Sequence, residues 1–111
     1  VHQFCKIGAH AMTGVGTVVL HDLPPYVMAS GDSAKPHGLN SEGLRRRQFS
    51  AERIAALRKA YRLLYRQGLS LEQARSGITE LAGEAGTDAQ SAADLTLLAS
   101  FLAGATRGIV R

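Results

Sequence analysis

The feature that most constrains the fold is a six-residue periodicity in residues 1–24. Val1, Ile7 and Val19 recur at one phase of the repeat, and Gly8 and Gly14 follow in the next phase. One branched and one small residue in each unit of six is typical of a parallel β-helix, in which the branched side chain points inward and the small residue fits a tight corner. We therefore expect residues 1–31 to form the last hexapeptide coils of a β-helix and the exit from it.

Two consecutive prolines mark the end of this repeat. Pro24 and Pro25 each lack a backbone N–H and have a fixed φ, so a regular strand is expected to stop there. Residues 27–39 contain Gly31, Pro36 and Gly38 among polar residues. That composition predicts an irregular connection rather than a strand or a helix.

The amount of repeat sequence is small for a β-helix. Residues 1–24 supply little more than one coil if a coil takes three hexads, and a β-helix needs several stacked coils to bury its interior. The edge above Val1 would otherwise expose unpaired backbone groups and apolar side chains. Since the sequence also begins without Met, we expect further coils to precede Val1 in a longer protein.

From residue 40 onward the periodicity becomes helical, which predicts a small helical domain over residues 32–111 with three main helices. Ser50 is a predicted N-cap, Ser70 with Gln73 and Thr87 with Gln90 are predicted capping boxes, and Gly68 suits a helix C-terminus. The predicted apolar stripes are Ile54, Leu57, Tyr61, Leu64 and Tyr65; Leu71, Ala74, Ile78, Leu81 and Ala85; and Leu95, Leu98, Phe101 and Leu102.

Positive charge is concentrated in residues 45–66, although the net charge of the chain is only +4. This basic block consists of Arg45, Arg46, Arg47, Arg53, Arg58, Lys59, Arg62 and Arg66, with Glu52 as its single acid. Such a block attracts anions, which leaves nucleic acid, a nucleotide phosphate or an acidic protein as partners, and a solvated helix face as the alternative. A basic helical nucleic-acid-binding domain would account for the arginines, but for neither the hexads nor the prolines.

Composition narrows the classes of protein to which this sequence can belong. The longest apolar runs are far shorter than the roughly 20 residues of a membrane span, and the N-terminus has no signal-peptide pattern. Cys5 is the only cysteine, so an internal disulfide is impossible and a small buried thiol in a reducing, cytoplasmic compartment is expected. The Cys and His positions do not have metal-ligand spacing, so neither a metal nor another cofactor is expected.

Four segments together resemble one family of acyltransferases. They are VHQFCKIGAH at residues 1–10, DLPPYV at 22–27, GLNSEGLRRR at 38–47 and TRGIVR at 106–111. The family transfers a 3-hydroxyacyl chain from acyl carrier protein to the 3-hydroxyl of UDP-N-acetylglucosamine, the first step of lipid A biosynthesis. The resemblance implies a left-handed parallel β-helix, a helical C-terminal domain and a homotrimer. A related hexapeptide acyltransferase with another sugar acceptor is the alternative within this fold.

The resemblance also implies which residues bind the sugar nucleotide. By their positions in the matching segments these are His2, Gln3, Asn40, Glu42, Arg46 and Arg47. The residue types suit the ligand, because Asn and Glu can read the donors and acceptors of uracil, and a forked guanidinium suits a pyrophosphate. Which of the arginines 45–47 contacts phosphate stays open at this point.

Two further roles are expected. His10 and Val15 match the region of the family's acyl-chain groove, where Val15 occupies the position of a residue that limits chain length. The alternatives are a surface position for His10, and a packed β-helix residue at Val15 with the groove ending elsewhere. Arg58, Arg62 and Arg66 are four residues apart and share a helix face, which would steer the acidic acyl carrier protein. The family's general base is a His upstream of this segment, without a counterpart here, so the chain alone is expected to be inactive.

Overall fold

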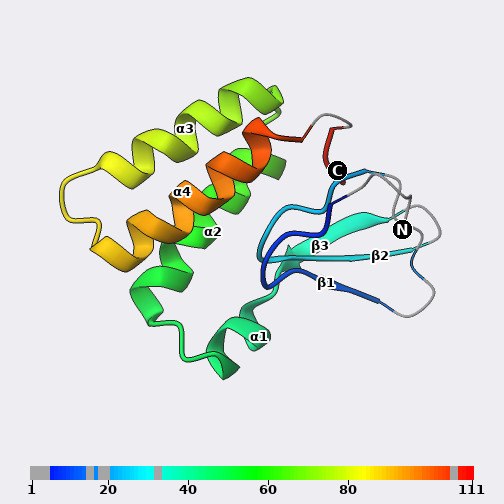
Figure 1. Ribbon diagram of the computed structural model, residues 1–111, viewed down its shortest axis with the longest axis horizontal. Helices are drawn as coiled ribbons and strands as arrows, with labels where there is room; N and C mark the ends of the chain where they lie inside the picture. The colour runs from blue at the N-terminus through cyan, green and yellow to red at the C-terminus, as the bar shows by residue number, and fades with distance from the viewer. Residues whose placement is uncertain (1–5, 15–16, 18–20, 32–33, 106–107) are drawn as a thin grey trace.

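The computed structural model describes residues 6–14, 17, 21–31, 34–105 and 108–111. Its strands are β1 (Met12–Thr13), β2 (Val27–Ser30) and β3 (Lys35–Leu39), and its helices are α1 (Ser41–Arg46), α2 (Ala51–Tyr65), α3 (Leu71–Gly83) and α4 (Ala89–Ala103). Figure 1 shows α3 and α4 side by side at one end of the molecule and the sheet at the other, with the short α1 following β3. None of the helices in the described ranges combines the length and hydrophobicity that a membrane span requires.

The N-terminal region forms one parallel turn of chain. Met12 pairs with Met28 in the parallel ladder of β1 and β2, and an isolated parallel bridge joins Ile7 to Leu23. Paired residues are therefore 16 positions apart, the same separation as in the hydrogen bond from the Lys6 N–H to Asp22. The repeat of this turn is shorter than three complete hexads. Gly8 is required for its close packing, because a Cβ there would lie 2.2 Å from the backbone nitrogen of Pro25.

One expectation for this region is wrong. Residues 27–39 are not an irregular connection, because β2 and β3 form an antiparallel pair with a bulge between Met28 and Ala29. Pro36 is compatible with β3 because β3 is an outer strand of the sheet, where one row of backbone N–H groups has no ladder partner. This hairpin crosses the boundary expected between residues 31 and 32.

Ile7 is a branched residue of the repeat that is not covered in this structure. Its side chain is 44% exposed, because its only bridge partner in the described ranges is Leu23 and no other described strand covers it.

The helix ends follow the local chemistry closely. Ser50 accepts a hydrogen bond from the Arg53 N–H, and Ser70 with Gln73 forms a complete capping box, which confirms both predictions. Gly68 has a φ of 65°, as expected for a helix C-terminus. The third predicted box is wrong: Asp88 is the N-cap of α4, and the Thr87 hydroxyl instead donates to the Leu81 carbonyl.

The predicted stripe of α3 also extends too far. The helix ends at Gly83, and Ala85 is an exposed residue in the turn to α4. Glu84 adopts an extended conformation and redirects the chain, so the apolar periodicity does not continue.

The core lies mainly between α2, α3 and α4. Its fully buried side chains include Leu57, Ile78 and Leu95, and Tyr26 enters the same cluster from the turn before β2. A smaller cluster contains Leu23, Val27, Ala29 and Val110. The C-terminal residues thus return to the N-terminal region, where the Val110 N–H donates to the Asp22 carbonyl at 2.8 Å.

Candidate functional site

Asn40 connects the start of α1 to the N-terminal turn. Its Oδ1 accepts from the Gly43 N–H at 3.3 Å, and its Nδ2 donates to the carbonyl of His10 at 2.9 Å. Gly43 belongs to the same arrangement, because a Cβ there would lie 2.5 Å from Asn40 Nδ2. Asn40 is only 9% exposed. The Asn-x-Glu-Gly pattern therefore has a structural basis, with Gly making room for the capping Asn.

The charged residues of α1 project into solvent. Glu42 lies 3.4 Å from the Nε of Arg46 and 3.9 Å from an Nη of Arg45, and all three side chains are more than half exposed. Arg47 is also exposed and forms no ion pair with any residue that the structure describes. Arg46 and Arg47, the pair favoured by the sequence, thus differ: one guanidinium already has a carboxylate neighbour and the other is free to bind an anion.

The ring of His10 packs against two other aromatic side chains. The residue adopts a positive φ of 57°, and its ring stacks on Tyr26 with centroids 5.8 Å apart and meets the edge of Phe49 at 5.0 Å. The side chain is therefore fixed against the turn before β2 and the loop before α2. This position lies beside α1, because the His10 carbonyl is the group that Asn40 holds.

Arg53 differs from the other basic residues of α2, because its charge is paired with a carboxylate inside the molecule. Its Nε and Nη2 donate to the two carboxylate oxygens of Asp94 at 2.8 and 2.9 Å, and its guanidinium lies 3.7 Å from the ring centroid of Phe49. The hydrogen bond to Asp94 raises the pKa of Arg53, and burial, together with the charge of Asp94, raises the pKa of Tyr26. Arg53 is structural, and the sequence missed this because its partner lies 41 residues away.

The structure brings Arg58, Arg62 and Arg66 together, as predicted. They line a groove of about 420 Å³ whose other wall includes Gly38 and Leu39 of β3 and Ser41 of α1. Arg58 donates weakly to the Ser41 hydroxyl at 3.5 Å. The groove therefore borders the start of the 38–47 segment, through residues that flank the predicted nucleotide residue Asn40.

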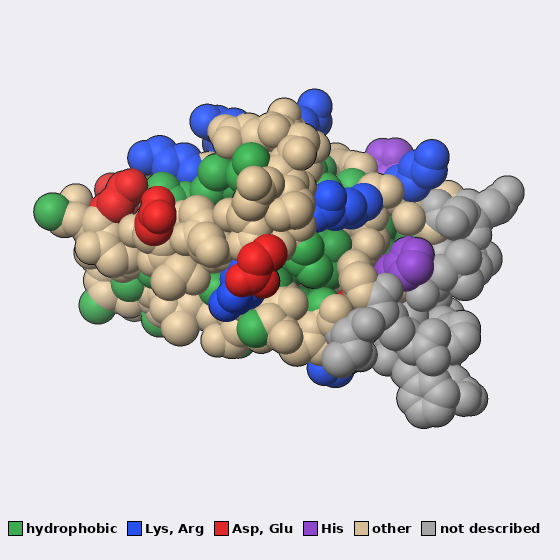
Figure 2. Space-filling model, turned by 90° about the horizontal axis from the view of Figure 1, so that it is seen from above, with side chains coloured by type: hydrophobic (Ala, Val, Ile, Leu, Met, Phe, Trp, Pro, Cys, Tyr) green, Lys and Arg blue, Asp and Glu red, His purple; other side chains and the backbone are tan. Residues whose placement is uncertain are grey.

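Charge is distributed unevenly over the surface. Figure 2 shows Lys and Arg side chains along the upper edge of the face that it presents, with acidic side chains further to the left and near the centre. Three arginines of the basic block are engaged by carboxylates, namely Arg45, Arg46 and Arg53. The cations available to a partner are thus concentrated on the groove side of α2 and at Arg47.

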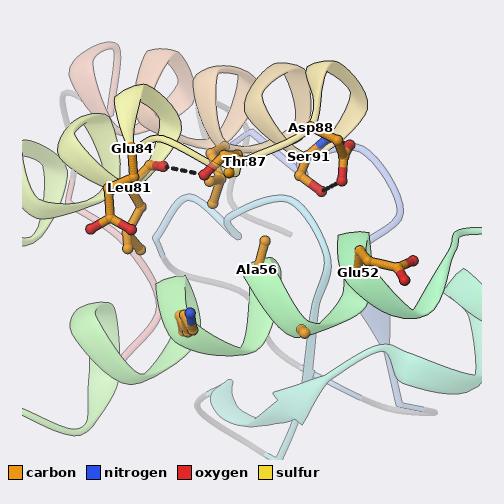
Figure 3. A pocket seen from close by; sticks show the side chains of 11 residues that line it. Glu52, Ala56, Leu81, Glu84, Thr87, Asp88 and Ser91 are labelled. Carbon is orange, nitrogen blue, oxygen red and sulfur yellow. Dashed lines mark hydrogen bonds between the residues drawn. The ribbon is translucent and has the colours of Figure 1, made fainter.

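A different hollow separates α2 from the turn between α3 and α4. It measures about 250 Å³, and Figure 3 shows Glu52 on one side and Glu84, Thr87 and Asp88 on the other. The hydroxyls of Thr87 and Ser91 are already used, donating to the Leu81 carbonyl and to Asp88. Because carboxylates dominate its rim, this pocket does not suit a nucleotide phosphate.

No group of three or more His, Cys, Asp or Glu side chains within the described ranges is arranged to hold a metal ion. His2, Gln3 and Val15, along with Cys5, lie outside the described residues. Their expected roles therefore remain predictions.

Comparison with known proteins identifies the family. Residues 22–110 match the family described as UDP N-acetylglucosamine O-acyltransferase, domain 2. The chain belongs to this family. The match begins at Asp22 and includes the prolines, the α1 motif and all three long helices.

Relatives of the UDP-N-acetylglucosamine O-acyltransferase family align with the whole chain. An acyl-[acyl-carrier-protein]–UDP-N-acetylglucosamine O-acyltransferase of Thiobacillus denitrificans is 55% identical over 111 residues, and one of Burkholderia orbicola is 54% identical. The chain spans 40% and 41% of these two relatives.

Solved structures of the family agree in three dimensions. LpxA from Acinetobacter baumannii superposes with a TM-score of 0.87 at 40% identity, and LpxA from Moraxella catarrhalis with 0.88 at 40% identity. Each comparison covers 99% of this chain and 40% of the solved chain.

Proposed function

We propose that this chain is the C-terminal part of an enzyme that transfers a 3-hydroxyacyl group from acyl carrier protein to the 3-hydroxyl of UDP-N-acetylglucosamine. The observation that carries the proposal is family membership over residues 22–110, together with a basic groove that borders the 38–47 motif. The reaction would be the first step of lipid A biosynthesis, and the enzyme would act in the cytoplasm.

The proposed architecture is the end of a left-handed parallel β-helix followed by a helical C-terminal domain, assembled as a homotrimer. Parallel pairing at a constant separation of 16 residues supports a coiled arrangement of the N-terminal region. The left hand and the trimer rest on the family resemblance. Further coils would come from the part of the enzyme that precedes residue 1.

The sugar nucleotide would be bound around α1. Arg47 and Arg46 would supply guanidinium groups to the pyrophosphate, with Glu42 orienting Arg46 or accepting from uracil. Asn40 would act chiefly by fixing α1, because its Oδ1 and one Nδ2 donor are already in use. His2 and Gln3 would face the same ligand from the N-terminal coil.

The reaction would be a direct acyl transfer. The 3-hydroxyl oxygen of the sugar attacks the thioester carbonyl, a His base from another part of the enzyme takes the hydroxyl proton, and the carrier thiol leaves with a proton. No cofactor is needed for this step. The chain on its own would lack the base and be inactive.

The acyl chain would lie along the N-terminal coil, near His10 and Val15. His10 would form a fixed wall there, since its ring is held between Tyr26 and Phe49. Val15 would limit chain length, because forcing extra carbons against a filled site costs about 1–3 kcal/mol, more than the roughly 0.8 kcal/mol gained for each buried methylene. In competition assays, Val15→Gly should shift preference towards longer chains, and an identical ranking would remove Val15 from this role.

The carrier protein would dock on Arg58, Arg62 and Arg66. The test is steady-state kinetics of the enzyme that contains this chain, with Arg58→Glu/Arg62→Glu compared with Lys59→Glu. Lys59 lies on the same helix but lines the acidic hollow instead. The double variant should raise the KM for the acylated carrier about tenfold or more and leave the KM for the sugar nucleotide unchanged. Equal effects of the double variant and the Lys59 control would contradict the docking surface.

A further inference from the structure

A second hollow adjoins the docking groove at the end of α2. It measures about 390 Å³, and its lining includes Pro36 of β3, Tyr65 of α2, Leu69 and Arg111. Tyr61 and Arg66 line both this hollow and the groove of Arg58 and Arg62. The two hollows therefore adjoin each other, and each has lining residues from α2 and β3. The second hollow is also lined by Arg111, a residue that the sequence did not associate with any site.

The second hollow offers two guanidinium groups. Neither Arg66 nor Arg111 forms an ion pair with any residue in the part of the chain that the structure describes, and both are exposed. Arg111 is nevertheless held in place, since its Nη1 donates to the carbonyl of Leu69 at 3.4 Å. A guanidinium that is anchored by one N–H keeps its other donors for a ligand.

Tyr65 adds an unusual feature to the wall of this hollow. Its hydroxyl is buried and has no hydrogen-bond partner among the described residues. Burial raises the pKa of Tyr65, and the nearby Tyr61 adds to this effect while the charge of Arg111 opposes it. Tyr65 and Arg111 line the same hollow. A buried hydroxyl without a partner is costly and calls for an explanation, and a small movement of the side chain that lets the hydroxyl donate to a ligand oxygen in the adjoining hollow provides one.

We propose that the hollow formed by Tyr65, Arg66 and Arg111 is an anion-binding subsite that receives a carboxylate side chain of the acyl carrier protein. Two guanidinium groups and a hydroxyl donor match the oxygens of a carboxylate. Charge complementarity with an acidic carrier identifies the occupant, and adjacency to the groove of Arg58 and Arg62 places it within one footprint. This inference rests on the proposed function and extends its docking surface to the C-terminal residues.

The test is calorimetric titration of acyl carrier protein into the enzyme that contains this chain. Arg111→Gln should weaken binding roughly tenfold, and Tyr65→Phe should weaken it a few-fold while leaving the melting temperature unchanged or higher. The affinity should also depend less steeply on salt in Arg111→Gln than in the wild type. Lys59→Gln is the matched control and should bind as the wild type does.

The remaining outcomes separate the subsite from the proposed function. If Arg58→Gln/Arg62→Gln weakens carrier binding while Arg111→Gln and Tyr65→Phe leave it intact, the subsite is wrong and the docking surface stands. If the wild-type enzyme does not bind the carrier at all, the proposed function and the subsite fall together. A parallel titration with inorganic phosphate that responds to Arg111→Gln, without any change in carrier affinity, would show a site for small anions and would likewise overturn the carrier assignment.

Discussion

The helical region and the N-terminal β region bury their apolar side chains to very different extents. In α2, α3 and α4, Leu57, Ile78 and Leu95 are at most 1% exposed. In the β region, Met12 is 53% exposed and Met28 is 37% exposed. The helices therefore form a core from their own side chains, whereas the strands have one face covered and one face open. Stability of the whole chain should depend mainly on the helical region.

The two regions are nevertheless joined at defined points. Tyr26 is 1% exposed and belongs to the helical core cluster although it precedes β2. Its hydroxyl donates to the Asp94 carbonyl in a long hydrogen bond of 3.4 Å. The C-terminal Val110 packs in the opposite direction, onto Leu23 and Val27 of the β region. Although the two regions differ in burial, Tyr26 packs into the helical core and Val110 packs into the cluster of the β region.

The largest expected effect is on the helical core. Leu57→Ala should lower the free energy of unfolding by about 4 kcal/mol, because it removes a fully buried side chain and leaves a cavity. Urea unfolding followed by circular dichroism measures it. Leu97→Ala is the matched control, since Leu97 is 45% exposed on α4 and should change stability by less than about 0.5 kcal/mol. Similar losses in both variants would contradict a core centred on these helices.

The next effect concerns the ion pair that lies where the two regions meet. Asp94→Ala should destabilise the chain by about 3 kcal/mol, because the side chain of Arg53 is only 19% exposed and would lose its carboxylate partner. The double variant Arg53→Met/Asp94→Leu should recover most of this loss, as it removes both charges. If the single and double variants are equally unstable, packing rather than charge pairing is the contribution of this pair.

The helices could be predicted because their signals are local. The strand pairings could not, because they depend on residues far apart in the sequence. Ser50, Ser70 and Gly68 act within a few residues of themselves, so their roles can be read from neighbouring positions. By contrast, Pro36 in β3 has the composition of a loop, and it occupies a strand only because β2 is available as a partner. The return of Val110 to Asp22 has no signature in the sequence at all.

A smaller effect is expected at the junction between the strands and α1. Asn40→Ala should cost about 2 kcal/mol, since it removes the N-cap of α1 and the hydrogen bond to the His10 carbonyl. Asn40→Asp keeps the capping oxygen and should recover about half of the loss. Comparing both variants in urea unfolding separates the cap from the link to His10, and equal stability of the two would assign the whole effect to that link.

The sequence predicted the part of the candidate site that lies on a single helix face. The spacing of Arg58, Arg62 and Arg66 placed them together, and the structure does the same. The spacing gave no role to Arg53, which lies five positions before Arg58 and is drawn inward by Asp94 and Phe49. It also missed Arg111 and Tyr65, because their proximity depends on how the C-terminus passes the end of α2.

The smallest expected effect is a pH dependence confined to the helical region. Hydrogen bonds from the N–H and hydroxyl of Ser91 hold the pKa of Asp88 below its ordinary value of 3.8. Because the folded pKa is lowered, this carboxylate contributes stability above pH 3.8, and the contribution is lost as the pH falls through the folded pKa. Urea midpoints measured from about pH 6 to about pH 2.5 should therefore fall further for the wild type than for Asp88→Asn. Parallel curves would show that the cap is insensitive to charge.

The most direct test of the central claim is the identity of the product. The enzyme that contains this chain should be incubated with a 3-hydroxyacyl carrier protein and UDP-N-acetylglucosamine, and the product analysed by mass spectrometry and NMR. The account predicts one new ester at the 3-hydroxyl of the sugar, together with free carrier thiol. The isolated 111-residue chain should give no product under the same conditions. An intact thioester with the complete enzyme, or acylation of another position or another sugar in preference, would contradict the account.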